Sequence, residues 1–356
     1  MQIESLAKKI PEWINDGNPL RSLLFSKVLL VRNIIGFSFP GKSSNDGKLE
    51  TRDLAVKAIE NTLAGENLTI FNMEDLTELQ RKVLVERRLI PREFAEGNII
   101  GRSVAITSDE ALSIYLNFEN HISVQVLKTE SNLRDGFERA FEIVTHLSDE
   151  LDFAFNKELG FLTASLADTG IGAKFTHFFH IPVLEIERQT QNIGKGSDEL
   201  FFSFERDEHL TNTGVEGFYI VKNLSTLGIG ENKLIDQLDK FSQRIVEYET
   251  KMQGIAYIDN KEVYEDKGFR ALGTLQTARM LSFQECVQLL SDVRTALILK
   301  FLDRKIDPQL LLKLMFQIYP GHLSVILNKL EPADQTKTTI IRNIEKSRAD
   351  FLRTLF

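Results

Sequence analysis

Cysteine is nearly absent from this sequence, in which Cys286 is the single thiol among 356 residues. One thiol excludes an internal disulfide and any zinc or iron–sulfur site built from several cysteines, so we expect no metal centre of that kind. Long apolar runs are also missing, because no stretch approaches the ~20 residues that span a bilayer. Residues 1–11 lack the apolar centre of a signal peptide, so we expect a cytoplasmic protein without a membrane partner.

An excess of positive charge is missing as well. The chain has 43 Lys and Arg against 51 Asp and Glu, which gives a formal net charge of −8. Nucleic-acid-binding proteins usually carry a basic surface, so we expect no nucleic-acid partner. Apolar residues make up 42% of the chain and charged residues 26%, as in an ordinary soluble globular protein. The length predicts about two domains.

Apolar and polar residues alternate in segments 112–116 and 121–127, as in half-buried strands, and the four residues between them predict a hairpin. We predict further strands at 27–35, 160–164, 178–187, 199–205 and 217–222, and helices at 51–64, 73–89, 133–155 and 231–253. From residue 261 onward the patterns are helical. The sequence therefore predicts an α+β protein with a largely antiparallel sheet. Its expected parts are a helical segment (1–20), the sheet-containing domain (21–254) and a helical C-terminal domain (255–356).

The pattern G-x-x-x-x-G-K-S occupies residues 36–43, directly after a predicted strand. A P-loop NTPase would use Lys42 and Ser43 of this motif to bind phosphates. That mechanism needs a helix to begin at the lysine, so that its N-terminus faces the phosphate. Residues 43–47 are instead typical of a loop. A P-loop NTPase therefore stays an alternative hypothesis.

Other isolated residues give weak functional signals. His177 and His180 lack a third ligand nearby, whereas catalytic zinc sites take three protein ligands, so we expect both in the core. Cys286 lies on an apolar helix and is interpreted as a small buried hydrophobe. Ser165 and His121 form a conceivable nucleophile–base pair, but no nucleophile-elbow pattern surrounds the serine.

Four short segments carry a combined signal. They are Val-Leu-Val-Glu at 83–86, Asn-Phe-Glu-Asn-His at 117–121, Leu-Gly-Phe-Leu-Thr at 159–163 and Gly-Ile-Gly at 170–172. In this order they resemble the motifs of the ATP:guanido phosphotransferase (phosphagen kinase) family. The segments Leu-Ser-Asp-Val-Arg at 290–294 and Pro-Gly-His-Leu at 320–323 are similar to the bacterial protein-arginine kinases in particular. The resemblance spans residues 20 to 345.

The resemblance implies a curved antiparallel sheet flanked by helices, followed by an all-helical C-terminal domain. It also implies a reaction in which the ATP γ-phosphoryl group moves to a guanidine nitrogen. Such transfers depend on positioning and on cations that neutralise the phosphates. The family supplies these cations as arginines, together with a carboxylate that orients the guanidine and a cysteine beside it.

The family's first phosphate motif, Ser-Arg-x-Arg, falls on residues 26–29. Ser26 matches, Lys27 replaces the first arginine and Leu29 replaces the second. Arg32 keeps the basic position that follows. A lysine retains the charge but loses the bidentate fork of a guanidinium, whereas a leucine loses both. The resemblance therefore assigns nucleotide binding to Ser26, Lys27 and Arg32, with one arginine missing.

Two further nucleotide-binding segments also depart from the family pattern. Ser123 replaces a phosphate arginine of the motif that contains the hairpin tip. The Gly-x-Gly-x-Arg turn falls on Gly170, Gly172 and Lys174, again with lysine in place of arginine. The mobile Arg-Gly-Thr loop corresponds to residues 211–217, where the chain has no arginine. A phosphoarginine-binding motif expected near 335–340 does not match the sequence there.

The resemblance assigns three catalytic positions. Glu119 keeps the guanidine-orienting carboxylate, and Ser165 stands where the family has its cysteine. Glu216 is expected to supply the second carboxylate from the 207–217 loop. Replacing the cysteine with serine removes a thiol that ionises easily. The resemblance assigns no metal ligand among these side chains.

The loss of several phosphate-binding arginines predicts a much slower phosphotransfer, because removing one preorganised charge stabiliser lowers the rate by ~10²–10³. We therefore hypothesise a protein-arginine-kinase homologue with weak or no phosphotransfer, a pseudokinase-like regulator in cytosolic protein quality control. The alternatives are an active protein-arginine kinase, which would use ATP and Mg²⁺, and the P-loop NTPase. The resemblance implies proteins with arginine side chains as clients, an activator subunit, a Clp-type AAA+ protease as a partner, and a homodimer.

Overall fold

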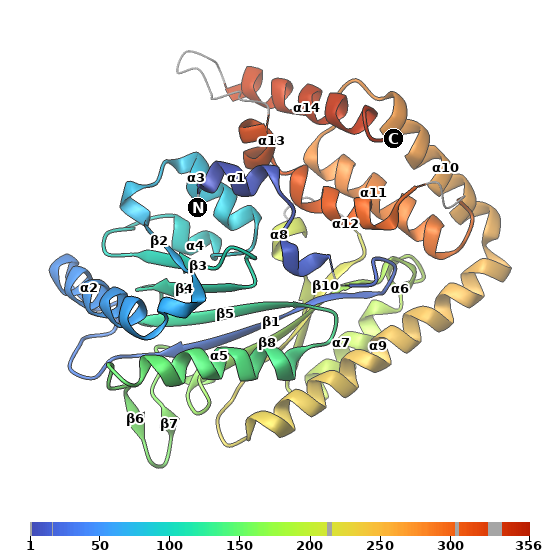
Figure 1. Cartoon of the computed structure of the whole chain (residues 1–356). Helices are drawn as coiled ribbons and strands as arrows, with labels where there is room; N and C mark the ends of the chain where they lie inside the picture. Colours follow the sequence, from blue (N-terminus) through green and yellow to red (C-terminus); the bar gives the residue numbers. More distant parts are fainter. Residues whose placement is uncertain (1, 16, 212–215, 303–305, 327–336) are drawn as a thin grey trace.

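The computed structural model describes residues 2–15, 17–211, 216–302, 306–326 and 337–356. Its centre is an antiparallel sheet of eight strands in the order β2-β3-β4-β5-β1-β8-β10-β9 (Figure 1). The strands are β1 (Leu23–Arg32), β2 (Thr69–Asn72), β3 (Ser103–Ile106), β4 (Leu112–Leu116), β5 (Ile122–Thr129), β8 (Ala173–His180), β9 (Phe202–Arg206) and β10 (Phe218–Asn223). The short strands β6 (Phe155–Asn156) and β7 (Gly160–Phe161) form a separate hairpin.

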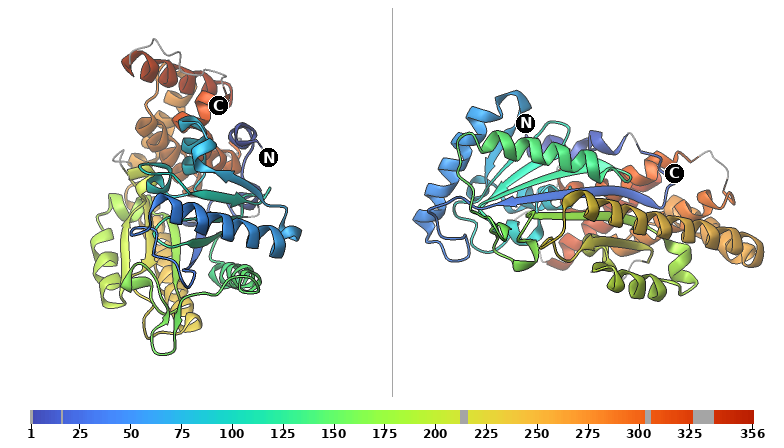
Figure 2. Two further views of the ribbon diagram at one scale, coloured as in Figure 1. Left: turned by 90° about the vertical axis from the view of Figure 1, so that its left-hand side faces the viewer. Right: turned by 90° about the horizontal axis from the view of Figure 1, so that it is seen from below.

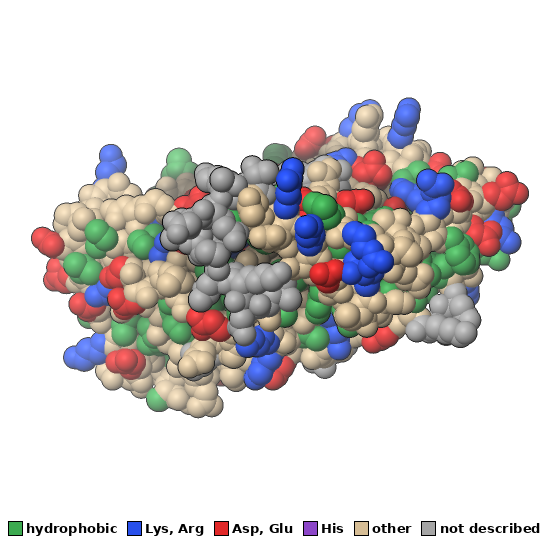
Figure 3. Space-filling view, turned by 90° about the horizontal axis from the view of Figure 1, so that it is seen from above, with side chains coloured by type: hydrophobic (Ala, Val, Ile, Leu, Met, Phe, Trp, Pro, Cys, Tyr) green, Lys and Arg blue, Asp and Glu red, His purple; other side chains and the backbone are tan. Residues whose placement is uncertain are grey.

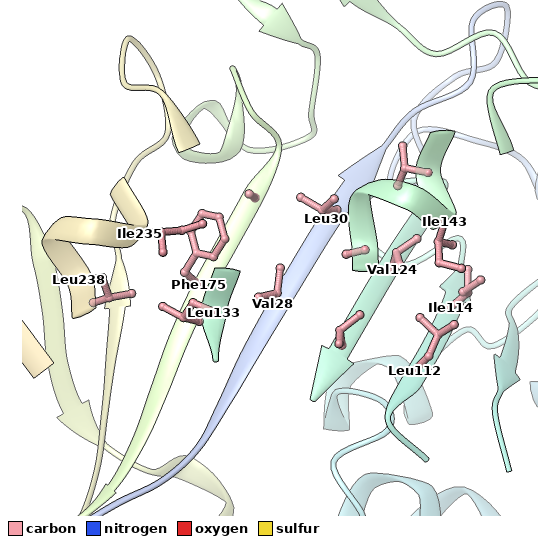
Figure 4. Packing of buried hydrophobic residues seen from close by; sticks show 14 of the residues in the cluster. Val28, Leu30, Leu112, Ile114, Val124, Leu133, Ile143, Phe175, Ile235 and Leu238 are labelled. Carbon is pink, nitrogen blue, oxygen red and sulfur yellow. The ribbon is translucent and has the colours of Figure 1, made fainter. Parts of the chain in front are cut away.

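Two long helices cover one face of this sheet. Figure 2 shows from below that α5 (Leu133–Leu147) and α9 (Glu231–Asp259) lie along the strands. Because successive side chains of a strand point to opposite faces, every second residue of the central strands contacts these helices. Val28, Leu30 and Phe175 are such residues, each no more than 1% exposed, and they pack against both helices (Figure 4). The opposite face of the same strands is therefore free to carry polar side chains.

The remaining helices lie around the sheet or, in the C-terminal part, gather at one end of it. Those of the N-terminal two thirds are α1 (Ile3–Lys8), α2 (Asn45–Thr62), α3 (Glu78–Glu86), α4 (Arg92–Ala95), α6 (Pro182–Ile186), α7 (Thr190–Glu199) and α8 (Glu208–Thr211). The C-terminal part contains α10 (Lys261–Thr277), α11 (Phe283–Ile298), α12 (Pro308–Gln317), α13 (Pro320–Ile326) and α14 (Lys337–Arg353). None of the helices in the described segments is long and apolar enough to cross a bilayer. On the face seen in Figure 3, basic and acidic side chains are interspersed.

The C-terminal helices share a hydrophobic core with one end of the sheet. Phe25 of β1 and Phe178 of β8 belong to the same buried cluster as residues of α11 and α12. A buried polar contact reinforces this packing, since the Glu86 carboxylate accepts hydrogen bonds from the backbone N–H groups of Gly321 (2.9 Å) and His322 (3.0 Å). The C-terminal part is therefore attached directly to α3, next to the polar face of the sheet.

The predicted fold class is confirmed, including the hairpin of β4 and β5 and the helical C-terminal part. Three local predictions are wrong. The predicted strand 178–187 ends at His180, because Pro182 occupies the first turn of α6, where its missing N–H costs nothing. The helix predicted over 133–155 ends at Leu147, and residues 43–47 are not all loop, because Ser44 caps a helix that begins at Asn45. The boundary predicted at 254 falls inside α9, and the division into domains stays a prediction.

A buried carboxylate on α9 makes the stability of the fold depend on pH. Glu249 accepts hydrogen bonds from the backbone N–H groups of Val183 (3.2 Å) and Leu184 (2.9 Å), and burial raises its pKa to about 7. The unfolded chain, with an ordinary glutamate pKa, binds fewer protons than the folded chain between these two values. We therefore expect the free energy of unfolding to fall as pH rises from about 4.5 to about 7.

The substitution Glu249→Gln tests this dependence, because a glutamine does not titrate. We expect the variant to lose that part of the decline in unfolding free energy, measured by urea denaturation at pH 5 and pH 8. Glu247→Gln is the matched control, since Glu247 is exposed on the same helix. A decline that is the same in wild type and Glu249→Gln would contradict the assignment.

Candidate functional site

A cavity of about 520 Å³ lies on the sheet face opposite α5 and α9. Its floor is made by alternate residues of β5, β1, β8 and β10. One wall is formed by residues 88–93, which are the turn after α3 and the start of α4. Another is formed by residues 115–120, which are the end of β4 and the hairpin loop that follows. Because the strands alternate, residues next to each other in the sequence serve the core and the cavity in turn.

The cavity brings together several positions that the sequence predicted as functional. Lys27, Ser123 and Lys174 line its floor, and Glu119 lines its wall. Leu29, which stands where the family motif has an arginine, faces the same space and pairs in register with Lys174 across β1 and β8. The retained lysines and the replaced arginine positions thus lie in one place, as the resemblance implied.

Ser26 and Arg32 do not line this cavity. The Ser26 side chain faces the other way, with its hydroxyl 3.4 Å from the Lys128 carbonyl oxygen. The Arg32 guanidinium lies 3.5 Å from the centre of the Phe161 ring and donates to backbone carbonyls, including that of Ile171 at 3.0 Å. Burial lowers the pKa of Arg32 to about 9. In this structure Arg32 therefore holds the glycine-rich turn in place.

Gly170 and Gly172 shape that turn and contact no part of the cavity. Their φ angles are +116° and +68°, a region that side chains with a Cβ rarely adopt. A Cβ on Gly172 would also lie 2.7 Å from a guanidinium nitrogen of Arg32. The glycines allow the chain to reverse tightly, so that Asp168 and Lys174 on either side both reach the cavity, where they form an ion pair of 3.1 Å.

The hairpin that carries Glu119 is anchored on both sides. Asn117 has a φ of +59° and donates hydrogen bonds of 2.8 Å to the carbonyls of Lys48 and Gly101. The Asn120 side-chain oxygen accepts a 2.8 Å bond from the backbone N–H of Ala164. These bonds fix the backbone on each side of Glu119, whose own side chain is exposed at the cavity wall.

Both ring nitrogens of His121 contact backbone atoms. Its Nδ1 accepts a hydrogen bond from Ile34 (3.0 Å), and its Nε2 contacts the Ser38 carbonyl oxygen at 3.0 Å. Burial lowers its pKa. A pairing of this imidazole with Ser165, which the sequence suggested weakly, is therefore wrong. Ser165 itself lies in the loop before β8, where its carbonyl accepts a 2.6 Å bond from Thr163, and it does not line the cavity.

Two predicted regions are only partly covered by the structure. Residues 212–215, within the predicted mobile loop, and residues 327–336, which include the start of the predicted phosphoarginine motif, lie outside the described residues. Glu216 is described, and its backbone N–H donates to the side chain of Gln288 on α11 at 3.1 Å. Glu216 does not line the cavity, so its catalytic role stays a prediction.

The structure adds functional candidates that the motifs did not indicate. Arg88 forms a bidentate pair with Asp207 (3.2 and 2.5 Å), and its guanidinium lies about 5 Å from the rings of Phe25 and Phe178. Burial by itself raises the pKa of Asp207, but the neighbouring Arg88 charge outweighs it and holds the pKa below its usual range. Arg92, Thr176 and Lys222 also line the cavity. Strand alternation indicates the last two, whereas no local pattern indicates Arg88 or Arg92.

The cavity is close to electrical balance. Five Lys and Arg residues line it together with four Asp and Glu residues, and burial lowers the pKa of His209 to about 3, so that this ring is neutral. Arg88 and Lys174 are each paired with a lining carboxylate. Lys27 differs, because no described carboxylate lies within ion-pair distance of its amine. Burial, with Arg88 nearby, lowers its pKa to about 8.

Three other sequence candidates prove to be parts of the core. His177 contacts the Ser242 hydroxyl and His180 the Ser291 hydroxyl, each at 2.7 Å, and both imidazoles are fully buried. Cys286 is buried, and burial raises its pKa to about 12, so it is an unreactive apolar side chain. No cluster able to hold a metal ion occurs within the described segments.

Comparison with known families decides the assignment of the chain. A family model described as the C-terminal catalytic domain of ATP:guanido phosphotransferases matches residues 50–252, which is more than half of the sequence. The chain belongs to the ATP:guanido phosphotransferase family. A second model, the protein-arginine kinase McsB C-terminal domain, matches residues 261–356. Lys42 of the P-loop pattern is an exposed loop residue and does not line the cavity.

Curated relatives place the chain within a branch of this family. It is 30% identical over 323 residues to a protein-arginine kinase of Moorella thermoacetica, covering 89% of this chain and 91% of that protein. It is 29% identical over 356 residues to a protein-arginine kinase of Halothermothrix orenii, covering 98% and 97%. These relatives, named protein-arginine kinases, therefore align with most of the chain, including the C-terminal part, and ATP is the phosphoryl donor that the family name implies.

Solved structures support the fold alone. The duplicated taurocyamine kinase of Schistosoma mansoni with bound transition-state-analogue components superposes with a TM-score of 0.59 at 22% identity, covering 72% of this chain and 36% of that chain. A lombricine kinase crystal structure gives a TM-score of 0.59 at 16% identity, covering 71% and 72%. Both matches agree with an antiparallel sheet flanked by helices.

Proposed function

We propose that this ATP:guanido phosphotransferase family member has weak or no protein-arginine kinase activity and acts as a pseudokinase-like regulator in cytosolic protein quality control. The observation that carries the proposal is the floor of the cavity. Leu29 and Ser123 face it at the two positions where the family motifs have phosphate-binding arginines. Without their guanidinium groups, the charge that develops during phosphoryl transfer has fewer stabilising partners.

The remaining charges also fit MgATP poorly. The lining residues carry one positive charge in excess, whereas a triphosphate stays net negative by more than one charge even after Mg²⁺ has offset part of it. Two of the five cations, Arg88 and Lys174, are already neutralised by Asp207 and Asp168. A bound triphosphate would have to displace these carboxylates or leave them next to its own negative oxygens, and both cost free energy. The retained residues therefore support binding of a less charged group better than catalysis with MgATP.

A phosphotransfer assay tests the proposal. The purified chain is incubated with γ-labelled ATP, Mg²⁺ and an arginine-rich unfolded protein, and half of each sample is treated with acid, because a phosphoramidate is acid-labile. We expect incorporation at least about a hundredfold below that of the Moorella thermoacetica relative, given the loss of preorganised charge. Glu119→Ala is expected to match wild type. Acid-labile label that disappears in Glu119→Ala would overturn the proposal.

An active protein-arginine kinase is the second candidate, and one observation favours it. Five basic residues still line the cavity, and Arg88, Arg92 and Lys222 were not part of the family's arginine motifs. In that case Lys27 and Lys174 would hold the phosphates and Glu119 would orient the guanidine.

We further propose proteins with arginine side chains as clients, with a homodimer, an activator subunit and a Clp-type AAA+ protease as partners. The support is that relatives named protein-arginine kinases align with 89% and 98% of this chain.

A further inference from the structure

Three polar residues form one row across the floor of the cavity. Lys27 of β1 pairs in register with Thr176 of β8, and Thr176 pairs with Lys222 of β10. All three face the cavity. Adjacent strands lie about 4.8 Å apart, so the backbones of the two lysines are about 10 Å apart with the threonine between them. At this spacing the two lysine side chains can both contact a small group that binds next to the Thr176 hydroxyl.

The two lysines of the row differ in their charged neighbours. No described carboxylate forms an ion pair with Lys27, and its amine lies 5.9 Å from the centre of the Phe178 ring. Lys222 forms an ion pair with Glu205 of β9 at the rim, where both side chains are about one third exposed. An ion pair with that exposure contributes little stability. Lys222 is therefore available to a ligand that offers more negative charge than one carboxylate.

We propose that Lys27, Thr176 and Lys222 form a binding subsite for a single phosphoryl dianion. Two ammonium groups and one hydroxyl match a tetrahedral group that carries nearly two negative charges and several acceptor oxygens. Thr176 and Lys222 lie outside the positions that the family motifs matched, whereas Lys27 stands at a motif position. The inference deepens the proposed function, since it names what a cavity unsuited to catalysis would still bind.

The chemistry of the walls bears on the source of this group. Glu119 lines the same cavity and supplies a carboxylate that a guanidinium would pair with. A phosphorylated guanidine combines one phosphoryl dianion with one guanidinium cation. Its small net negative charge matches the single excess positive charge of the lining. A triphosphate presents the same kind of phosphoryl group with a larger negative charge.

Calorimetric titration with inorganic phosphate tests the subsite directly. We expect Lys222→Gln to weaken phosphate binding about tenfold, because one charge-assisted hydrogen bond is lost. Thr176→Val, which keeps the shape and removes the hydroxyl, is expected to weaken it severalfold. Glu205→Gln is expected to strengthen binding, because it removes the carboxylate that forms an ion pair with Lys222. Lys233→Gln, an exposed lysine on α9 beyond the opposite sheet face, is the matched control.

Competition against bound phosphate then identifies the source. Phosphoarginine that displaces phosphate at lower concentration than ATP supports the phosphorylated guanidine, whereas the reverse order assigns the row to a nucleotide phosphate. Equal phosphate affinity in wild type, Lys222→Gln and Glu205→Gln would overturn the subsite. The result is separable from the proposed function: an active kinase with an intact row refutes only the pseudokinase proposal, and an inactive chain without phosphate binding refutes only the row.

Discussion

Phosphotransfer to arginine is expected to increase at least about a hundredfold when Leu29 and Ser123 are both replaced by arginine. Both residues face the cavity, and restoring one preorganised charge stabiliser recovers about 10²–10³ in rate. The two effects need not add, because groups that act on the same phosphates work as a unit. The cavity of about 520 Å³ leaves room for the longer side chains. The measurement is acid-labile label transferred from γ-labelled ATP.

The double substitution Leu29→Met and Ser123→Thr is the control for this experiment. It changes the same two positions without adding charge, so we expect no gain of activity. A folded Leu29→Arg/Ser123→Arg variant that stays as inactive as wild type would show that the missing arginines are not what limits catalysis. The replaced cysteine position at Ser165 would then become the next residue to restore.

Removal of the Asp207 carboxylate is expected to destabilise the protein by about 3–5 kcal/mol. The Arg88–Asp207 pair is buried, with side-chain exposures of 8% and 6%, so Asp207→Ala leaves an uncompensated guanidinium charge inside the protein. The Tyr319 hydroxyl, from the chain between α12 and α13, donates to the neighbouring His209 carbonyl at 3.2 Å. The loss is therefore expected to extend to the packing of the C-terminal helices. Urea denaturation measures the change.

A surface ion pair gives the comparison. Arg134 and Asp236 are 2.7 Å apart but about half exposed, and we expect Asp236→Ala to change the unfolding free energy by at most about 1 kcal/mol. Equal effects of Asp207→Ala and Asp236→Ala would contradict the expectation that burial makes the Arg88–Asp207 pair important for stability. The low pKa of Asp207 adds a pH signature. Its stabilisation is present above the ordinary aspartate pKa and is lost as pH falls through the lower folded-state value.

Local sequence patterns predicted the hairpin of β4 and β5 and the helix α5, because the apolar residues that face the core recur at a regular spacing in each element. The prediction of a strand at 178–187 is wrong because a short apolar run fits a strand or a buried helix equally well. Only Ile181 separates the end of β8 from α6, which begins at Pro182. The prediction of a loop at residues 43–47 missed the helix cap at Ser44, because serine and asparagine are favoured both in loops and at helix N-termini.

By itself, the sequence determined the class of fold, the family resemblance, and the loss of arginine at the positions of Leu29 and Ser123. Motif order and residue identity are properties of the chain, and they need no coordinates. It also marked Lys27, Lys174 and Glu119, which the structure places in one cavity.

Only the tertiary structure decided which charges in that cavity are free. Arg88 and Asp207 are 119 positions apart in the sequence, yet they neutralise each other across the cavity wall. Arg32 keeps a basic family position but turns to the opposite side, where it holds the 170–172 turn. Thr176 joins Lys27 and Lys222 in one row because the register of three strands aligns them. Electrostatic interactions depend on distance and burial, and neither quantity can be obtained from the amino-acid sequence alone.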